Sequence, residues 1–358
     1  MKTGDMPGVE VRPQRIRIWD RAGRIFNVRF ESKADICSAK AHVRFTPKAD
    51  TCGALGDVRF VPKADIALRR LPPPYPVSTM ARTAEEGMAQ DTEAKSVAVN
   101  GVSLYYERQG TGPAVFFIAG STGDAGNFSR AAALLADEFT VVTYDRRGNS
   151  RSPRPAGWTT TSVTEQADDA AALINALGLA PTVIFGASVG GLIALDLIIR
   201  YPHLVRACVL QEPSIFFVLP DPTAELSARR AILTEGLARG GPREAVKALM
   251  RYLNDDDVFS AIPADILERM LSNAETIISI EVPGFAGWRL QTADLPTLKA
   301  PIALLVASDT LPIYKAVTTW LAKQIRVQPV TVPGRHGFYF YRPQDLANAL
   351  RPILKNVP

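Results

Sequence analysis

One serine in this sequence has neighbours that could make it a nucleophile. Ser188 lies in the run 186–191, which reads Gly-Ala-Ser-Val-Gly-Gly. An apolar run at 182–185 precedes it, and a helical pattern at 192–200 follows it. This order of strand, sharp turn and helix puts the serine at the apex of a strained turn, where glycines leave room for adjacent backbone. The free N–H groups of the new helix also favour developing negative charge. We predict that Ser188 is a catalytic nucleophile.

A serine hydroxyl is a weak nucleophile and needs an adjacent general base. The chain contains three histidines. His42 lies in an N-terminal repeat, and His203 lies just past the helical pattern, where a surface position is the simplest interpretation. His336 comes directly after the last apolar run, 327–332, in a loop at the carboxyl end of a predicted strand. We predict that His336 is the base.

A carboxylate must orient the imidazole of that base, and two acids compete for the role. Asp309 follows the apolar run 302–306 and lies between the serine and the histidine in the chain. Glu212 ends the run 207–210 and belongs to the same edge of the predicted sheet. The chain order Ser, Asp, His favours Asp309. Glu212 stays as the alternative.

Two backbone amides are needed to stabilise the oxyanion that forms when a serine attacks a carbonyl carbon. Val189 follows the nucleophile directly and would supply one of them. Ser121 would supply the other, from the glycine-rich loop 119–123 that follows the apolar run 115–118. This loop lacks the Gly-Lys-Ser/Thr of a phosphate-binding loop, so we do not predict a nucleotide site there.

The glycines around Ser188 have a rival interpretation. They are similar to the glycine-rich turn of nicotinamide-dependent short-chain dehydrogenases. That turn follows the first strand of its domain, whereas this one follows several strands. Such enzymes also need Tyr-x-x-x-Lys, and no tyrosine of this chain has a lysine four residues later. We set the dehydrogenase interpretation aside.

Eight short runs rich in β-branched and aromatic residues begin near residue 96. The first two flank Asn100-Gly101, a dipeptide typical of a tight hairpin turn, and predict an antiparallel pair. The later runs are continuously apolar, as expected of buried parallel strands. The eight runs are 97–99, 104–107, 115–118, 140–144, 182–185, 207–210, 302–306 and 327–332.

Helical patterns separate these runs. Apolar residues recur with helical spacing at 167–174 and at 346–354. Alternation of strand and helix predicts an α/β fold, with a mostly parallel eight-stranded sheet and helices on both faces. The long segment 213–298 has helical patterns and no strand run. We expect it to form a helical lid over the carboxyl ends of the strands, where ligands bind in such sheets.

The N-terminal segment has a different texture. Val-Arg-Phe and Lys-Ala-Asp each occur three times with a period of 15 residues, and a Pro-rich stretch follows at 72–76. Each repeat offers little apolar surface to bury, so we predict that residues 1–90 are a disordered extension and linker, with the globular domain at 91–358. The extension resembles those that arise when a start codon is assigned too far upstream.

Charge and composition exclude several classes of protein. Residues 1–90 carry a net charge of +6 and the rest a net charge of −1, so the basicity does not predict a nucleic-acid partner for the main domain. Three scattered cysteines predict neither a disulfide framework nor a zinc site. The first 11 residues lack the apolar stretch of a secretory signal, and no apolar run is long enough to span a membrane. We expect a reduced, cytoplasmic protein.

Taken together, residues 96–358 resemble the α/β-hydrolase fold superfamily, which includes esterases and lipases. The resemblance departs from the usual pattern in two places. Ala119 stands where a histidine is usual before the oxyanion loop, and 306–309 lacks the usual glycine before the acid. Four matches carry the resemblance: the Gly120 loop, the run 145–152 (Asp-Arg-Arg-Gly-Asn-Ser-Arg-Ser), the Ser188 turn and the Asp309/His336 pair.

This resemblance implies acyl transfer to water without a cofactor or a metal. Ser188 would attack an ester, thioester or lactone carbonyl of a small-molecule substrate, and water would release the acid. Asp145 and Arg147 would be structural, buttressing the loop after the fourth strand. Cofactor-free haloperoxidases and carbon–carbon hydrolases use the same triad, and some proteins of this fold are small-molecule receptors. These alternatives stay open.

Aromatic residues in the predicted lid bear on the substrate. They indicate a partly apolar acyl or alcohol group, although packing of the lid alone explains them equally well. They are Phe216, Phe217, Phe285 and Trp288.

We predict that residues preceding the globular domain are dispensable. A shortened protein that begins at Met80 or Met88 should fold, stay soluble and keep full activity, because the repeat buries little surface to offset the entropy of ordering it. Melting curves and steady-state rates of the full and shortened proteins test this. A melting temperature lowered by more than about 5 °C, roughly 1–2 kcal/mol, would show that the extension packs on the fold.

Overall fold

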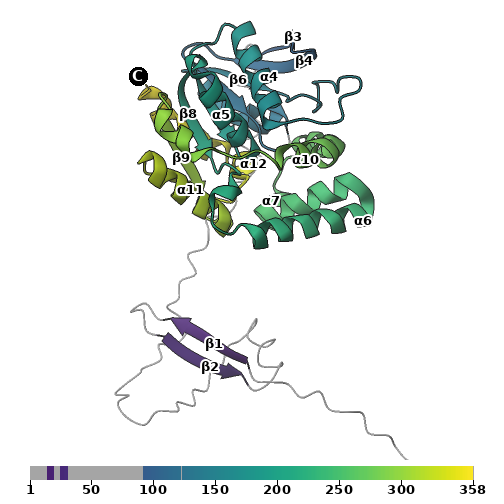
Figure 1. Cartoon of the computed structure of the whole chain (residues 1–358), viewed down its shortest axis with the longest axis vertical. Coiled ribbons are helices and arrows are strands. Elements are labelled where there is room, and N and C mark those ends of the chain that lie inside the picture. The colour runs from purple at the N-terminus through teal and green to yellow at the C-terminus, as the bar shows by residue number, and fades with distance from the viewer. Residues whose placement is uncertain (1–13, 20–24, 31–91, 122, 358) are drawn as a thin grey trace, which may run out of the picture. The chain divides into compact units, whose positions relative to one another are not determined.

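The computed structural model describes residues 14–19, 25–30, 92–121 and 123–357. The chain divides into two compact units, Met1–Tyr75 and Pro76–Pro358. In the first unit, β1 (Gln14–Trp19) and β2 (Ile25–Phe30) pair antiparallel (Figure 1). We did not expect this pair, although the alternation of arginine and isoleucine within β1 is typical of a strand. The repeats beyond residue 30, His42, the Pro-rich stretch and the boundary predicted near residue 90 lie outside the described residues.

The second unit is built on an eight-stranded sheet, which confirms the predicted fold. The strand order is β10-β9-β8-β7-β5-β6-β4-β3. From β10 to β6, each strand pairs parallel with the next one in the sheet. β4 pairs antiparallel with both of its neighbours, β6 and β3. The strands are β3 (Glu93–Val99), β4 (Val102–Gln109), β5 (Ala114–Ile118), β6 (Thr140–Tyr144), β7 (Thr182–Ala187), β8 (Val205–Gln211), β9 (Ile302–Ala307) and β10 (Val330–Val332).

The hairpin between β3 and β4 forms where the sequence predicts it. Asn100 and Gly101 have φ angles of 47° and 73°, and Val99 pairs with Val102 across the turn. Two consecutive residues with positive φ give a turn whose twist matches that of the strands. Glycine, and to a lesser extent asparagine, tolerates this backbone region, which explains the dipeptide.

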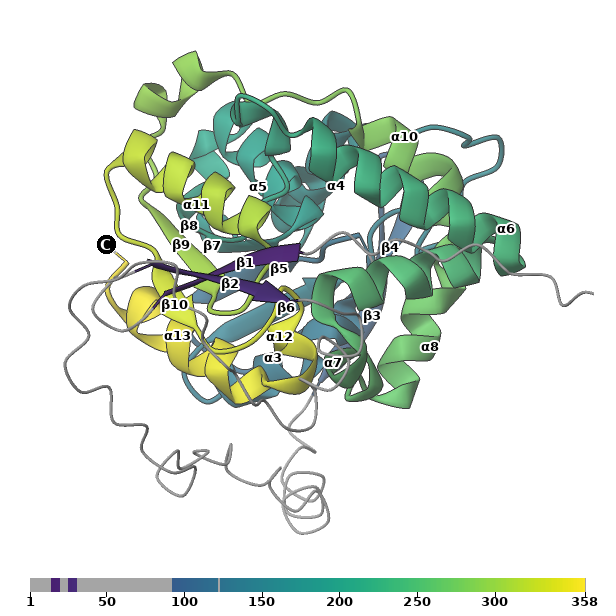
Figure 2. The ribbon, with the colours of Figure 1, turned by 90° about the horizontal axis from the view of Figure 1, so that it is seen from below.

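Helices cover both faces of the sheet, as Figure 2 shows. The buried residues of α4 (Val163–Ala176), α5 (Val189–Arg200) and α11 (Pro312–Ile325) belong to one apolar core. Those of α3 (Ser129–Leu135) and α13 (Pro343–Lys355) belong to the other. Alternate residues of β5, β7 and the central part of β8 enter opposite cores, so these stretches are apolar on both faces of the sheet.

The segment between β8 and β9 contains no strand in the structure. Its longest helix, α6, is interrupted at Gly240 and Gly241, and the two halves then pack so closely that a side chain on Gly236 would meet the Ala245 backbone at 2.4 Å. We call residues 213–298 the lid segment. Its helices are η4 (Phe216–Val218), α6 (Thr223–Asn254), α7 (Asp256–Ser260), α8 (Ala264–Ser272), α9 (Ala274–Thr276), η5 (Ile277–Glu281), α10 (Val282–Phe285) and η6 (Thr292–Thr297).

Two ion pairs connect the lid segment to loops at the carboxyl ends of central strands. Arg269 of α8 lies 3.3 Å from Asp124, in the loop after β5. Glu281 of η5 lies 2.7 Å from Arg146, in the loop after β6. The helices of the lid segment therefore reach the edge where ligands bind in parallel sheets. No helix in the described part of the chain combines the length and the apolar composition needed to cross a bilayer.

Candidate active site

Ser188 occupies a strained turn between β7 and α5. Its φ of 54° and ψ of −117° lie in a region that non-glycine residues rarely adopt. The turn is held by a bond from the Ser188 amide to the Gln211 carbonyl, 2.9 Å. A side chain on Gly190 would meet the Ile118 carbonyl oxygen at 2.2 Å, and one on Gly186 would meet the Gly190 carbonyl oxygen at 2.7 Å. The sharp turn is therefore possible only with the glycines that mark it in the sequence.

His336 lies in the loop after β10 and is buried against a carboxylate. Its Nδ1 is 2.5 Å from Glu212 Oε2, and Glu212 is fully buried at the end of β8. The Ala307 amide donates to Glu212 Oε1 at 2.6 Å, and the Thr310 hydroxyl donates to Oε2 at 2.9 Å. Both carboxylate oxygens are thus fixed. When Nδ1 donates to this carboxylate, Nε2 is left free to accept a proton.

The prediction that Asp309 orients the histidine is wrong in this structure, and Glu212 occupies that position instead. Asp309 is exposed, and its carboxylate accepts a bond from Ser308 Oγ at 2.8 Å. It lies two residues beyond β9, on the surface of the loop. Glu212 directly follows β8, and its positive φ of 45° redirects the chain there. The prediction from chain order failed because Glu212 also lies between Ser188 and His336 in the chain, and both acids follow neighbouring parallel strands at the same edge.

A second serine contacts Ser188. Ser214 Oγ lies 3.2 Å from Ser188 Oγ, and the Ser214 amide donates to the Ser188 carbonyl at 3.2 Å. In the described part of the chain, no hydrogen bond joins Ser188 Oγ to His336. Gln211 connects the backbones of Ser188 and His336. Its main-chain carbonyl accepts from the Ser188 amide, and its side-chain Nε2 donates to the His336 carbonyl at 3.1 Å. Sequence reasoning missed Ser214, which has no motif of its own.

The glycine-rich loop after β5, which we call the oxyanion loop, lies directly beside Ser188. A Cβ on Gly120 would be 3.2 Å from Ser188 Cβ and 3.8 Å from its Oγ. Ser121 follows Gly120, and Val189 is the first residue of α5. Among the described residues, neither the Ser121 amide nor the Val189 amide has a backbone hydrogen-bond partner. The two amides predicted as oxyanion donors are therefore placed near Ser188 with no internal bond to give up.

Comparison with known proteins places the chain in a family. A family model described as alpha/beta hydrolase fold matches residues 113–234. The uncharacterized hydrolase YraK of Bacillus subtilis is 31% identical over 266 residues, which are 73% of this chain and 95% of YraK. This chain belongs to the α/β-hydrolase fold superfamily.

Two further relatives of this α/β-hydrolase carry more specific descriptions. The 2-(acetamidomethylene)succinate hydrolase of Mesorhizobium japonicum is 27% identical over 268 residues, which are 67% of this chain and 87% of that enzyme. The structure of a thermophilic esterase from Thermogutta terrifontis superposes with a TM-score of 0.59 at 25% identity, covering 75% of this chain and 99% of the esterase. The predicted family and fold are confirmed.

Side chains of the loop after β6 hold neighbouring parts of the candidate site in place. The buried carboxylate of Asp145 accepts from the Ala125 amide at 2.7 Å, which anchors the chain just beyond the glycine-rich loop, and from Arg151 Nε at 2.7 Å. Arg147 instead ties this loop to α4, through a 2.6 Å bond to Asp169. The structural roles that the resemblance implied for Asp145 and Arg147 agree with these contacts.

An aromatic ring of the α/β-hydrolase lies flat against His336. The Tyr314 and His336 rings are nearly parallel, at 14°, with centroids 3.9 Å apart. Tyr314 is fully buried in α11, and its hydroxyl accepts from Arg229 of α6 at 3.3 Å. The helical pattern of 312–325 identifies Tyr314 only as a core residue. Its contact with the histidine depends on tertiary packing, so the sequence carried no signal for it.

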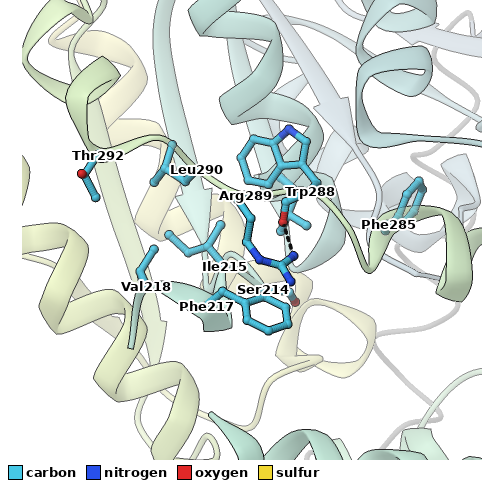
Figure 3. A pocket seen from close by; sticks show the side chains of 10 residues that line it. Ser214, Ile215, Phe217, Val218, Phe285, Trp288, Arg289, Leu290 and Thr292 are labelled. Carbon is cyan, nitrogen blue, oxygen red and sulfur yellow. Dashed lines mark hydrogen bonds between the residues drawn. The ribbon is translucent and has the colours of Figure 1, made fainter. Parts of the chain in front are cut away.

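A pocket of about 200 Å³ opens next to Ser214. Most of its lining is apolar, and it comes from α5, from the chain after β8 and from the end of the lid segment. The Arg289 guanidinium lies over the Phe217 ring, 3.3 Å from its centroid, and Arg289 Nη1 donates to the Trp288 carbonyl at 2.8 Å (Figure 3). The same Nη1 donates to the Ala286 carbonyl at 2.7 Å. The lining residues are Leu192, Ser214, Ile215, Phe217, Val218, Phe285, Trp288, Arg289, Leu290 and Thr292.

Phe217, Phe285 and Trp288 line this pocket, and Phe216 packs instead in the apolar core against Tyr314, with ring centroids 5.4 Å apart. Phe285 also belongs to that core and Trp288 packs against it, so the predicted lid aromatics serve both to line a cavity and to pack the core. In the described residues, no three His, Cys, Asp or Glu side chains gather closely enough to hold a metal ion.

We predict that Glu212→Gln is far more damaging than Asp309→Asn. The amide can donate to His336 Nδ1 and so favours the wrong tautomer, which should lower turnover by about three to four orders of magnitude. Asp309→Asn changes an exposed side chain and should leave turnover within about twofold. Steady-state rates of both variants decide between the two acids. A large loss of turnover in Asp309→Asn together with a small loss in Glu212→Gln would restore the prediction that Asp309 orients the histidine.

We predict that Tyr314 fixes the histidine through its ring face. Tyr314→Leu should lower kcat by about tenfold with little change in KM, because the imidazole loses the flat surface that orients it. Tyr314→Phe keeps that face and should stay within about threefold of the wild type. Values of kcat and KM, with melting curves as a check on folding, test this. Equal losses in both variants would assign the effect to the Arg229 bond instead.

Proposed function

We propose that this chain is a serine hydrolase that cleaves an ester, thioester or lactone of a small, partly apolar substrate through an acyl-enzyme intermediate. The observation that carries the proposal is the bond between His336 Nδ1 and Glu212 Oε2, next to a serine in a strained strand–turn–helix junction. A buried carboxylate that holds one imidazole nitrogen is the arrangement that turns the other nitrogen into a base.

In the proposed mechanism, Ser188 Oγ attacks the carbonyl carbon while His336 Nε2 takes its proton. The Ser188 hydroxyl must first turn from Ser214 toward the histidine. Glu212 stabilises the imidazolium that results, without taking the proton itself. The amides of Ser121 and Val189 stabilise the oxyanion. His336 then protonates the departing alcohol or thiol, and a water molecule releases the acid by the same steps in reverse.

The apolar pocket supports a substrate with one small apolar group. It begins at Ser214, which touches the nucleophile, and its volume of about 200 Å³ suits a short acyl or alcohol group. The similarity to the Thermogutta terrifontis esterase supports ester cleavage over the other reactions of the superfamily. Ester specificity stays part of the proposal because fold alone does not fix the reaction.

A fluorophosphonate probe tests the proposal directly. It should label the protein at Ser188, and Ser188→Ala should abolish labelling and lower turnover by about 10³-fold or more, because the triad acts as a unit. Ser260→Ala, which changes an exposed serine of α7, is the matched control and should behave as wild type. p-Nitrophenyl esters of increasing acyl length, thioesters and lactones then define the substrate.

Two results would contradict the proposal in different ways. Labelling that persists in Ser188→Ala would place the nucleophile elsewhere. A wild-type protein that is neither labelled nor active on any ester, thioester or lactone would favour a different reaction of the superfamily or a receptor role.

A further inference from the structure

Arg146 is a fully buried cation at the carboxyl end of the sheet. Its side chain has 0% exposure and pairs with Glu281, which has 2%. The pair is bidentate, because Nη1 lies 2.7 Å from Oε1 and Nη2 lies 2.8 Å from Oε2. The two residues are 135 positions apart, and Glu281 belongs to the lid segment. A buried charge needs such a partner, and the planar guanidinium matches a carboxylate well.

The same guanidinium makes a third bond, to the oxyanion loop. Arg146 Nη2 donates to the Gly120 carbonyl at 2.9 Å, and the Gly123 amide donates to the same oxygen at 3.0 Å. The Gly120 carbonyl and the Ser121 N–H belong to one peptide unit, which is planar and trans. The two groups therefore point in opposite directions. Whatever fixes the carbonyl also fixes the direction of the Ser121 N–H.

We infer that Arg146 is a positioning residue of the oxyanion hole and that Glu281 of the lid segment holds it in place. This inference rests on the proposed function. Arg146 touches no reacting atom. It acts on the Gly120–Ser121 peptide, where a charged donor on the carbonyl fixes the orientation of the Ser121 amide. The same bond polarises the peptide, which makes that amide a stronger donor to the oxyanion.

Among the described residues, no side chain other than Arg146 donates to the Gly120 carbonyl. The resemblance to the superfamily places a histidine where this chain has Ala119, whose methyl group can donate no hydrogen bond. Arg146 reaches the next residue, Gly120, from the neighbouring loop after β6. Asn149 steadies the pair from the same loop, since its Nδ2 donates to Glu281 Oε1 at 2.8 Å. The buried pair thus supplies a fixed donor at a place where the chain lacks the usual one.

The neighbouring pair Arg147–Asp169 offers a matched control. It is also bidentate, with Arg147 Nε 2.7 Å and Nη2 2.6 Å from the two carboxylate oxygens, and it is also buried. Its arginine reaches α4 and the Asn100 carbonyl, and not the oxyanion loop. Loss of either pair should lower stability, but only loss of the Arg146 pair should weaken the oxyanion hole.

The test compares Arg146→Gln/Glu281→Gln with Arg147→Gln/Asp169→Asn, because double changes leave no unpaired buried charge. The readouts are kcat, KM and the inhibition constant of a trifluoromethyl ketone, whose adduct with Ser188 places an oxyanion in the hole. The corresponding methyl ketone measures ground-state binding. We expect the first variant to lose about 10- to 100-fold in kcat and in trifluoromethyl ketone affinity, with KM and methyl ketone binding within about twofold.

Arg146→Lys completes the design, because lysine keeps the charge opposite Glu281 without the guanidinium fork. It should also lower kcat, and it replaces the double variant in the comparison if the glutamine variants do not fold. Wild-type kcat and trifluoromethyl ketone affinity in a folded Arg146 variant, or equal losses in the Arg147 control, would overturn the inference alone. A wild-type protein without labelling or turnover would overturn the proposed function and this inference with it.

Discussion

Parallel pairing of the central strands is the constraint on which the site depends. Strands β5, β7, β8, β9 and β10 are hydrogen bonded in parallel, so their carboxyl ends meet at one edge of the sheet. The oxyanion loop follows β5, Ser188 follows β7, Glu212 follows β8 and His336 follows β10. Residues more than 200 positions apart, such as Gly120 and His336, are thereby brought to one edge of the sheet without any side chain having to cross the core. The helices on both faces keep the sheet rigid, and the loops at that edge are left to carry the chemistry.

Buried ionic groups fix the loops at this edge, and each is paired within a small network. Glu212 accepts three bonds, Asp145 holds the oxyanion loop and Arg151, and Arg146 pairs with Glu281. Burial raises the pKa of Asp124 and the charge of Asp145 raises it further, while Ser150 and Arg269 favour the ionised form. Such networks add little to the free energy of folding, because desolvation offsets their attraction. Their consequence is a set of dipoles that is already oriented before a substrate arrives, which is what stabilisation of an oxyanion requires.

The sequence predicted the fold, which is confirmed, and also the sharp turn at Ser188 and the loop position of His336, because each leaves a local signal. Continuous apolar runs mark the parallel strands, glycines mark the turn at Ser188, and few histidines compete. Glu212 and Asp309 could not be ranked in this way. Each follows a strand at the same edge, and which carboxylate meets His336 depends on the positive φ of Glu212 and on the register between β8 and β9. Tyr314 and Glu281 left no signal at all, because their partners lie in other elements and packing alone brings them together.

The lid segment contributes contacts to the candidate site. Through Arg229 it holds the hydroxyl of Tyr314, whose ring lies against His336, and through Glu281 it holds Arg146, which bonds to the oxyanion loop. Ser188 is held mainly by the sheet and α5, through Gln211 and the glycines of the turn, and Ser214 at the start of the lid segment adds two further contacts. One continuous insertion between two strands therefore contacts, through other side chains, both His336, the proposed base, and the loop of the proposed oxyanion donor. Phe285 and Trp288 of the same insertion line the apolar pocket. A substrate group bound in that pocket would therefore contact the segment that also holds Tyr314 and Arg146.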